Sequence, residues 1–296
     1  MQLALDRPSA RARVGGFVAL TKPRIIELLL VTTVPTMVVA QQGMPPLWLI
    51  AVTVLGGTFA AGGANAINMV VDRDIDAVMH RTRNRPLVTG VVQPTEALVF
   101  ALALEAIAFA LLWATVNLLS AVLAVAATAF YVFVYTLWLK RTSTSNIVIG
   151  GAAGAVPVLV GWAAVRDSLD WAPLVLFAVI FVWTPPHFWA LAVKYKDDYA
   201  AAEVPMLPVV ATLRTTATRI ILYTLVLWAL TLVFAPVAGM GALYTASAAG
   251  LGAVFLAFAI RLYRTPTPAV AMRLFSWSIT YVTLLFGAMA ADQLLR

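Results

Sequence analysis

Long apolar runs constrain this chain more than any other feature of its sequence. Several of them approach or exceed the roughly 20 residues that an α-helix needs to cross a bilayer. Within lipid the backbone must satisfy its own hydrogen bonds, and unbroken apolar runs favour helices over the alternating pattern of a barrel. Of the 296 residues, 62% are hydrophobic and 11% are charged, about half the charged fraction of a typical soluble domain. The sequence therefore predicts an all-α, polytopic membrane protein.

Nine spans emerge when the runs are divided at polar and Pro- or Gly-containing breaks. We expect these helices to form a bundle around an intramembrane cavity, and the first of them to be retained because no clear cleavage site follows it. The expected organisation is a basic cytoplasmic N-terminal segment, residues 1–22, followed by a nine-helix domain, residues 23–296. The predicted spans are residues 24–42, 47–67, 95–115, 118–138, 146–165, 171–193, 216–237, 242–262 and 272–292.

Basic residues predict the orientation, because Lys and Arg are retained on the cytoplasmic side. With the N-terminus inside, every one of the 20 Lys and Arg residues except Arg166 and Arg296 falls on the cytoplasmic side. We therefore expect a multi-pass protein of the plasma (inner) membrane with its charged end in the cytoplasm. This sorting, together with attraction to anionic lipid, accounts for the net charge of +7 without nucleic acid. The absence of cysteine excludes disulfides, thiolate metal sites and a cysteine nucleophile.

A first acidic group follows the second predicted span. Asn68, Asp72 and Asp76 recur every four residues, so they share one face of an α-helix, whereas Asp74 lies on roughly the opposite face. Amide and carboxylate oxygens are ligands that Mg²⁺ prefers, and this ion usually binds substrate phosphates as well. The alternative is a solvated helix end whose carboxylates are balanced by nearby arginines. Asn65 continues the series into the apolar run, where an unpaired amide is costly, and this favours a ligand site.

A second acidic group lies on the same predicted side, in "KYKDDYAAAEVPMLP". It contains Asp197, Asp198 and Glu203, with Lys194 just upstream. Two acidic groups that face each other could hold one or two Mg²⁺ ions, or Mn²⁺, around a diphosphate. Metal ions and basic residues make diphosphate a better leaving group, and an apolar bundle would keep water from a carbocation. The combination predicts ionisation of a prenyl diphosphate inside a membrane.

Four stretches of the sequence resemble the intramembrane aromatic prenyltransferase superfamily: "NAINMVVDRDIDAVMHRTRNRPL", "LKRTSTSNIVIGGAAGAVPVLVGWAA", "WTPPHFWALA" and "KYKDDYAAAEVPMLPVV". The superfamily signature N-x-x-x-D-x-x-x-D is met by Asn68, Asp72 and Asp76. The first and third stretches are similar to the branch that modifies haem. This resemblance implies that farnesyl diphosphate ionises and its allylic carbon joins a vinyl group of haem B, after which water completes the side chain of haem O. It also implies haem A synthase as a partner.

The resemblance assigns roles to individual residues. Asn68, Asp72 and Asp76 would hold one metal ion and Asp197 or Asp198 a second, which makes these five the expected catalytic residues. Adjacent residues on a helix point about 100° apart, so only one of Asp197 and Asp198 is expected to ligate directly. Relatives more often have glycine where this chain has Glu203. The expected substrate-binding residues are Arg24, Asn65, Arg73, Lys140, Arg141, Asn146, His187 and Lys194, of which Lys140, Arg141 and Lys194 would bind diphosphate.

Three of these residues have alternative interpretations. His187 could approach the haem iron or a propionate, or could simply pack near Trp183. Arg24 could reach a substrate or pair with Glu27 one helical turn away. Asn146 could contact substrate or cap the fifth span. The "GGAAGA" run from Gly150 is interpreted as a site of close helix packing.

Two other functions remain open at this point. A sister enzyme would prenylate a quinone or a chlorin, and spacing alone does not distinguish the acceptor. A secondary transporter of an anionic substrate could also use intramembrane carboxylates. Nine spans do not divide into two equal repeats, however, and the carboxylates gather at one end of the spans, so the sequence favours an enzyme.

Overall fold

The computed structural model describes residues 9–296, except for the side chains of residues 24–30. Over this range the chain is helical and contains no strand. The elements are α1 (Ala10–Leu20), α2 (Pro23–Gln41), α3 (Leu47–Val71), α4 (Arg73–Val78), α5 (Pro94–Thr115), α6 (Leu118–Ala129), the π-helix η1 (Phe130–Leu139), α7 (Lys140–Thr142), α8 (Asn146–Arg166), α9 (Trp171–Lys194), α10 (Lys196–Ala201), α11 (Leu207–Val210), α12 (Leu213–Val237), α13 (Ala242–Arg264) and α14 (Pro268–Leu294).

Eight helices in the described part of the chain are long and apolar enough to cross a membrane, counting the continuous helix Leu118–Thr142 as one. The first predicted span corresponds to α2, of which Val31–Gln41 is an apolar helical stretch. Predicted and observed ends differ by four residues at most, as where α3 reaches Val71 instead of residue 67. The all-α membrane fold is confirmed, with nine as an approximate helix count.

Polar caps explain several of the helix boundaries. The side chain of Asn117 accepts a hydrogen bond from the Ser120 backbone N–H at 2.8 Å and so begins α6. Its amide also donates to the Ala163 carbonyl at 2.7 Å, which ties the α5–α6 turn to the end of α8. Asp170 caps α9 in the same way, through the Ala172 N–H. The predicted break between spans 95–115 and 118–138 is therefore confirmed.

Close helix contacts in the centre of the bundle depend on glycine. A Cβ atom at Gly151 would lie 3.0 Å from the Thr184 side chain of α9, and one at Gly161 would lie 2.8 Å from the Thr33 carbonyl oxygen of α2. Gly151 confirms the packing interpretation of the "GGAAGA" run, and Gly161 makes a similar close contact further along α8. The small side chains let α8 lie against both neighbours.

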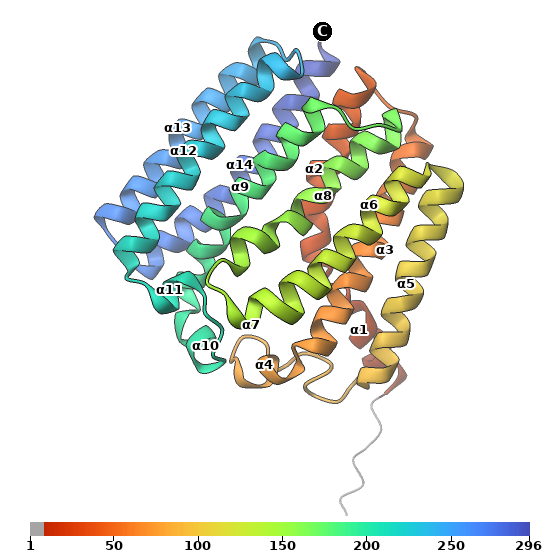
Figure 1. Ribbon diagram of the computed structural model, residues 1–296, viewed down its shortest axis with the longest axis vertical. Coiled ribbons are helices and arrows are strands. Elements are labelled where there is room, and N and C mark those ends of the chain that lie inside the picture. The colour runs from red at the N-terminus through yellow and green to blue at the C-terminus, as the bar shows by residue number, and fades with distance from the viewer. Residues whose placement is uncertain (1–8) are drawn as a thin grey trace, which may run out of the picture.

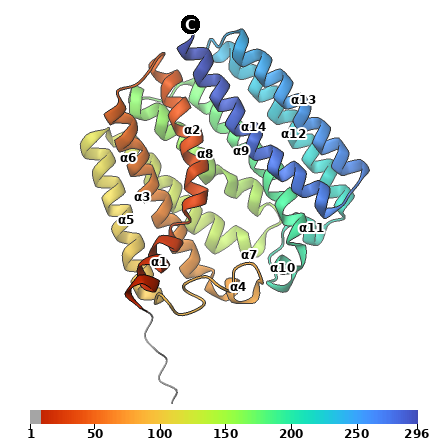
Figure 2. The same ribbon diagram turned by 180° about the vertical axis from the view of Figure 1, so that it is seen from behind.

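The short elements gather at one end of the bundle. In Figure 1 the C-terminus lies at the top, while α1, α4, α7, α10 and α11 lie at the bottom, and Figure 2 shows the same arrangement from behind. This end carries both acidic groups of the sequence, on α3, α4 and α10. The polar segments that connect the long helices therefore lie together at one end of the bundle.

Candidate active site

The first acidic group forms one continuous helical face. Although α3 ends at Val71 and α4 begins at Arg73, the Asp72 N–H donates to the Asn68 carbonyl at 2.9 Å and the Asp76 N–H to the Asp72 carbonyl at 2.8 Å. Asn68, Asp72 and Asp76 are 3%, 0% and 2% exposed. The face predicted from the four-residue spacing is confirmed, and the solvated helix end is wrong for these three residues.

Residues from three other segments surround Asn68 and Asp72. Lys22 Nζ donates to Asn68 Oδ1 at 2.9 Å, and Asn68 Nδ2 donates to Asp72 Oδ2 at 2.6 Å and to Thr136 Oγ1 at 3.2 Å. Lys140 Nζ donates to Asp72 Oδ2. The cluster therefore joins the α1–α2 turn, α3 and the η1–α7 region around one buried carboxylate.

Asp76 has a cation of its own. Arg85 Nη1 lies 2.6 Å from Asp76 Oδ2, and Thr82 Oγ1 donates to the Asp76 backbone carbonyl at 3.1 Å. Together Lys22, Arg85 and Lys140 surround two buried carboxylates, Asp72 and Asp76. Buried charges require such pairing, because desolvation costs several kcal/mol for each ion. When Lys22 is protonated, these five groups carry one positive charge in excess, which favours the binding of an anion.

Lys22 occupies an unusual backbone conformation directly before Pro23. Its φ of 52° lies in the left-handed region that lysine rarely adopts. Burial lowers the pKa of Lys22 to about 7, with Arg85 and Lys140 adding repulsion and the two carboxylates opposing it. Backbone strain of this kind is retained where the surrounding structure requires it, and it is common at functional sites.

Arg141 and Asp74 form an ion pair at the edge of the cluster. Two nitrogens of Arg141 lie 2.8 and 2.7 Å from the oxygens of Asp74, and Nη2 also donates to the Val71 carbonyl at 3.0 Å. The hydrogen bond from Arg141 lowers the pKa of Asp74 to about 2. Arg141 Nη2 lies 3.8 Å from Asp72 Oδ1. Arg141 thus borders the site while holding α4 against α7.

The second acidic group is built differently. Asp198 accepts hydrogen bonds from the backbone N–H groups of His80 and Arg81 at 3.3 and 3.1 Å, and the Arg81 guanidinium lies 5.2 Å from the centre of the Tyr195 ring. Asp197 is exposed and makes no hydrogen bond or ion pair with any described residue. The two adjacent carboxylates diverge, as helical spacing predicts. Asp198 therefore joins α10 to the segment after α4.

Glu203 stands at the end of this second group with φ 54° and an exposed side chain. The left-handed conformation favours glycine, so glutamate occupies a strained backbone position here. An apolar cluster covers the space between the two groups and buries Ile75, Met79, Ile147, Ala192, Tyr199, Val204 and Met206. This cluster packs the α4 and α10 segments against the ends of α8 and α9.

His187 is enclosed by aromatic rings. It stacks on Trp183 and Phe275, with ring centres 4.3 and 4.6 Å away. Ser278 Oγ donates to the Phe275 carbonyl at 2.6 Å and lies 2.7 Å from His187 Nδ1. Since the Ser278 proton is used, Nδ1–H must be the donor, which leaves a lone pair on Nε2. The packing interpretation is confirmed, and it still allows Nε2 to act as a ligand.

Asn146 is 1% exposed, and neither atom of its amide group has a hydrogen-bond partner in the described part of the chain. The N-cap of α8 is Ser145, which makes no side-chain capping bond. The capping interpretation is therefore wrong for Asn146. A buried amide without a partner costs about 1–3 kcal/mol, and a substrate group would remove this cost.

Other predicted residues lie apart from the cluster. Asn65 donates to the Thr21 carbonyl at 3.2 Å, which positions the turn that carries Lys22. Lys194 is exposed, with its ammonium group 5.4 Å from the centre of the Tyr195 ring. Arg24 lies in α2, but its side chain is outside the described residues, as is that of Glu27.

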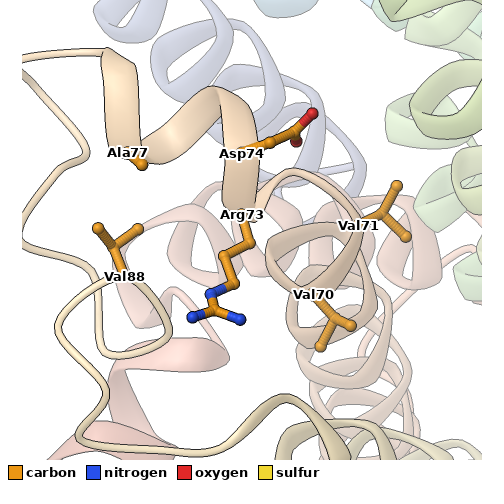
Figure 3. Close-up of a pocket in the computed structure, with 6 residues that line it drawn as sticks. All are labelled: Val70, Val71, Arg73, Asp74, Ala77 and Val88. Atoms are coloured by element: carbon orange, nitrogen blue, oxygen red, sulfur yellow. The ribbon is translucent and has the colours of Figure 1, made fainter.

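Arg73 is exposed, whereas its neighbour Asp72 is buried. In Figure 3 its guanidinium extends into a shallow groove between the end of α3 and the segment that carries Val88. The lining residues are Val70, Val71, Arg73, Asp74, Ala77 and Val88. Arg73 is exposed and forms no ion pair within the described chain. The structure therefore does not bring Arg73 to the predicted substrate site.

The donor set fits a hard divalent cation that is shared with a substrate. No three His, Cys, Asp or Glu side chains converge as a metal site in the described residues. Asp72 Oδ1 is nevertheless buried without a hydrogen-bond partner among the described side chains, and Asn68 Oδ1 is held only by Lys22. Mg²⁺ commonly takes one or two carboxylates and completes its shell with water and phosphate oxygens.

Residues 29–285 match the UbiA prenyltransferase family, and the chain belongs to this family. It is a multi-pass membrane enzyme of the prenyltransferase class, so the transporter alternative is wrong. The curated relatives named protoheme IX farnesyltransferase include one from Parafrankia sp., 56% identical over 98% of this chain and 93% of the relative. The Streptomyces avermitilis relative of that name is 53% identical over 96% of this chain and 95% of its own length.

Solved structures agree on the fold. A structure described as digeranylgeranylglyceryl phosphate synthase has a TM-score of 0.78 at 15% identity, over 96% of this chain and 99% of that chain. A UbiA homologue from Archaeoglobus fulgidus, bound to GPP and Mg²⁺, has a TM-score of 0.62 at 15% identity, over 93% of this chain and 99% of that one. At these identities the likeness concerns the fold alone. The resemblance found in the sequence is confirmed by the family match and the curated relatives.

Proposed function

We propose that this protein transfers a farnesyl group from farnesyl diphosphate to a vinyl group of haem B, which gives haem O. Family membership supports prenyl transfer, and relatives named protoheme IX farnesyltransferase support haem as the acceptor. The observation that carries the proposal is the buried face of Asn68, Asp72 and Asp76, surrounded by Lys22, Arg85 and Lys140. Such a site suits a diphosphate and a divalent cation more than a neutral substrate.

In this proposal Asn68, Asp72 and Asp76 bind Mg²⁺, or Mn²⁺ in its place, together with the diphosphate. When bound, the cation would neutralise the charge that develops on the leaving diphosphate. Lys22 and Lys140 now bind the oxygens of Asn68 and Asp72. We propose that both ammonium groups turn to the diphosphate oxygens when the substrate enters, because a phosphate offers charge-assisted hydrogen bonds.

Arg85 and Arg141 border the same space from Asp76 and Asp74. The role of second-metal ligand falls to Asp198 rather than Asp197 in this proposal, because Asp198 faces the segment after α4 while Asp197 faces solvent. Lys194, at the end of α9, would bind the diphosphate from the exposed edge of the site. The assignment to Asp198 is a prediction that a variant below tests, and the assignment to Lys194 stays a prediction.

The proposed reaction needs no protein nucleophile. The bond between the first farnesyl carbon and the diphosphate oxygen breaks, and its electron pair leaves with the diphosphate. The vinyl π-bond of haem B attacks that carbon. The cation left on the porphyrin side chain takes up water, which loses a proton to solvent and becomes the hydroxyl group. The apolar bundle around the site protects the first cation from water until the vinyl group has reacted.

On the acceptor side, His187 and Asn146 are the candidate contacts. The Nε2 lone pair of His187 suits the haem iron, and the unpartnered amide of Asn146 suits a propionate or the diphosphate. Arg24 is a further candidate for a propionate. Iron ligation would position haem without taking part in bond formation, since the reaction occurs at the porphyrin edge.

We propose the plasma (inner) membrane as the location, with residues 1–22 and the active site facing the cytoplasm. The sorting of Lys and Arg supports this orientation. The end that carries the short elements and both acidic groups would then be the cytoplasmic end (Figure 1). Haem A synthase is the proposed consumer of the product, on the strength of the resemblance.

The experiment that tests the function is incubation of the purified protein with haem B, farnesyl diphosphate and Mg²⁺, followed by mass spectrometry of the product. We expect a haem that carries one added farnesyl group and one added hydroxyl group. The same assay with a quinone or a chlorin distinguishes the sister activities. Transfer to one of these acceptors, with none to haem, would overturn the proposed acceptor and leave the prenyl-transfer class intact.

A further inference from the structure

Thr136 is a buried residue that the sequence does not single out. It lies in the π-helix η1 and is 0% exposed. Its hydroxyl donates to the carbonyl of Tyr131, five residues earlier, at 2.8 Å. Regular α-helices rarely extend into π-helix, and such segments frequently occur at functional sites. The unusual register places this hydroxyl against the acidic face of α3.

The contact with α3 determines how the Asn68 amide is oriented. A hydroxyl has one proton, and Thr136 gives it to the Tyr131 carbonyl. Thr136 Oγ1 can therefore only accept from Asn68, and the atom that faces it at 3.2 Å is Nδ2. The amide oxygen must then point to the other side, where it accepts from Lys22. The hydrogen-bond network therefore determines which end of the Asn68 amide is the oxygen and which is the nitrogen.

The orientation of Asn68 also affects Asp72. The second N–H of Asn68 Nδ2 binds Asp72 Oδ2, which leaves Asp72 Oδ1 buried without a hydrogen-bond partner in the described chain. Asp72 Oδ1, together with Asn68 Oδ1 once Lys22 turns away from it, can therefore face a cation. Asp72 Oδ2 also accepts from Asn68 Nδ2 and so favours the same orientation of the amide. Asp72 is itself a proposed metal ligand, however, whereas Thr136 contacts Asn68 and would not bind the metal.

We infer that Thr136 is a positioning residue of the metal–diphosphate site, because its hydroxyl holds the Asn68 amide with the oxygen directed to the cation. This inference rests on the proposed function. Hydrogen-bond partners of metal ligands typically change metal affinity about 10- to 100-fold when they are removed. With valine at position 136, the Asn68 amide loses one of its two acceptors and is free to turn its nitrogen towards the metal.

The test measures Mn²⁺ binding by electron paramagnetic resonance, in the presence of farnesyl thiodiphosphate, a slowly reacting analogue. Thr136→Val keeps the shape of the side chain and removes the hydroxyl, while Thr136→Ser keeps the hydroxyl. We expect Thr136→Val to weaken Mn²⁺ binding at least about 10-fold, and Thr136→Ser to remain within about threefold of the original protein. Thr136→Ala replaces the valine variant if that variant does not fold.

Thr224→Val is the matched control. Thr224 is equally buried, and its hydroxyl also donates to its own helix, to the Ile220 carbonyl at 2.8 Å. It lies in α12, away from the acidic face. We expect this variant to lose stability but not Mn²⁺ affinity. The pair separates a general effect of losing a buried hydroxyl from an effect on the site.

Unchanged Mn²⁺ affinity in Thr136→Val, or equal weakening in Thr136→Ser and Thr136→Val, would overturn the inference while the proposed function stands. If the original protein binds no Mn²⁺ with the analogue, the proposed metal-dependent function itself fails. The two failures are therefore distinguishable in one set of titrations.

Discussion

The two acidic groups share one end of the bundle and differ in almost every physical respect. Asp72 and Asp76 are 0% and 2% exposed and lie on a continuous helical face, whereas Asp197 is exposed on a six-residue helix. Asp72 pairs with Lys140, which is far away in the sequence, and Asp76 pairs with Arg85 in the segment after α4. Asp198, in the second group, binds backbone N–H groups instead of a basic side chain.

This difference shows that burial of the first acidic group costs free energy, because its carboxylates are removed from water. Two buried carboxylates are tolerable only with cations beside them, and the fold brings three cations to that position, one of them on a strained backbone. An exposed carboxylate such as Asp197 has no comparable cost. The structure therefore favours the first group as the centre of the chemistry and the second as a part that holds and completes the site.

The largest effect should come from removing divalent cations. Because every role proposed for the first group depends on a metal–diphosphate complex, a chelator should abolish farnesyl transfer, and added Mg²⁺ or Mn²⁺ should restore it. Product formation followed by mass spectrometry is the measurement. Full turnover in metal-free buffer would contradict the metal-binding account of both acidic groups.

Replacing one carboxylate of the first group should be nearly as severe. We expect Asp72→Ala or Asp76→Ala to lower turnover at least about 100-fold, because each removes stabilisation that matters most as the diphosphate departs. Asp74→Ala, which removes a carboxylate from the exposed side of the same helix, is the matched control and should cost much less. Near-normal turnover in folded Asp72→Ala and Asp76→Ala would mean that these carboxylates have only a structural role.

Asp198→Ala should have an intermediate effect. It removes the acceptor of two backbone hydrogen bonds and so loosens the segment after α4. We expect turnover to fall about 10-fold, which corresponds to roughly 1.4 kcal/mol, together with faster hydrogen exchange at the backbone N–H groups of His80 and Arg81. A drop in turnover with unchanged exchange would mean that Asp198 acts as a metal ligand without holding this segment, and unchanged turnover would contradict its role as second-metal ligand.

Asp197→Ala and Arg73→Gln should have the smallest effects. Both side chains are exposed and unpaired within the described chain, so we expect turnover to stay within about twofold and thermal stability to change little. Steady-state kinetics and a thermal unfolding curve are sufficient measurements. A loss comparable with that of Asp72→Ala would mean that the exposed side of this end also binds substrate.

The span pattern was predictable because lipid imposes it. A helix in a bilayer needs a long apolar run, so the breaks between runs locate the helix ends to within a few residues. The shared face of Asn68, Asp72 and Asp76 follows from helical geometry in the same way. That geometry also separates Arg73 from Asp72 by about 100°, so its absence from the cluster could have been anticipated.

Other parts of the site depend on features that leave no sequence signal. Lys22 reaches Asn68 only because its backbone adopts φ 52°. Arg85 is one of several arginines in its segment, and only the folded chain shows which of them contacts Asp76. Thr136 depends on a π-helix, and the acceptor role of Asp198 depends on backbone N–H groups, which every residue except proline provides.

The most direct test of the central claim is the Mg²⁺-dependent binding of farnesyl diphosphate, measured by isothermal titration calorimetry. The comparison uses the original protein, Asp72→Ala and Asp197→Ala without haem, so that no product forms. We predict that the original protein and Asp197→Ala bind farnesyl diphosphate with similar affinity and only with Mg²⁺, while Asp72→Ala binds at least about 100-fold more weakly. Equal binding by Asp72→Ala, or loss of binding in Asp197→Ala alone, would contradict the assignment of the diphosphate site to the buried group.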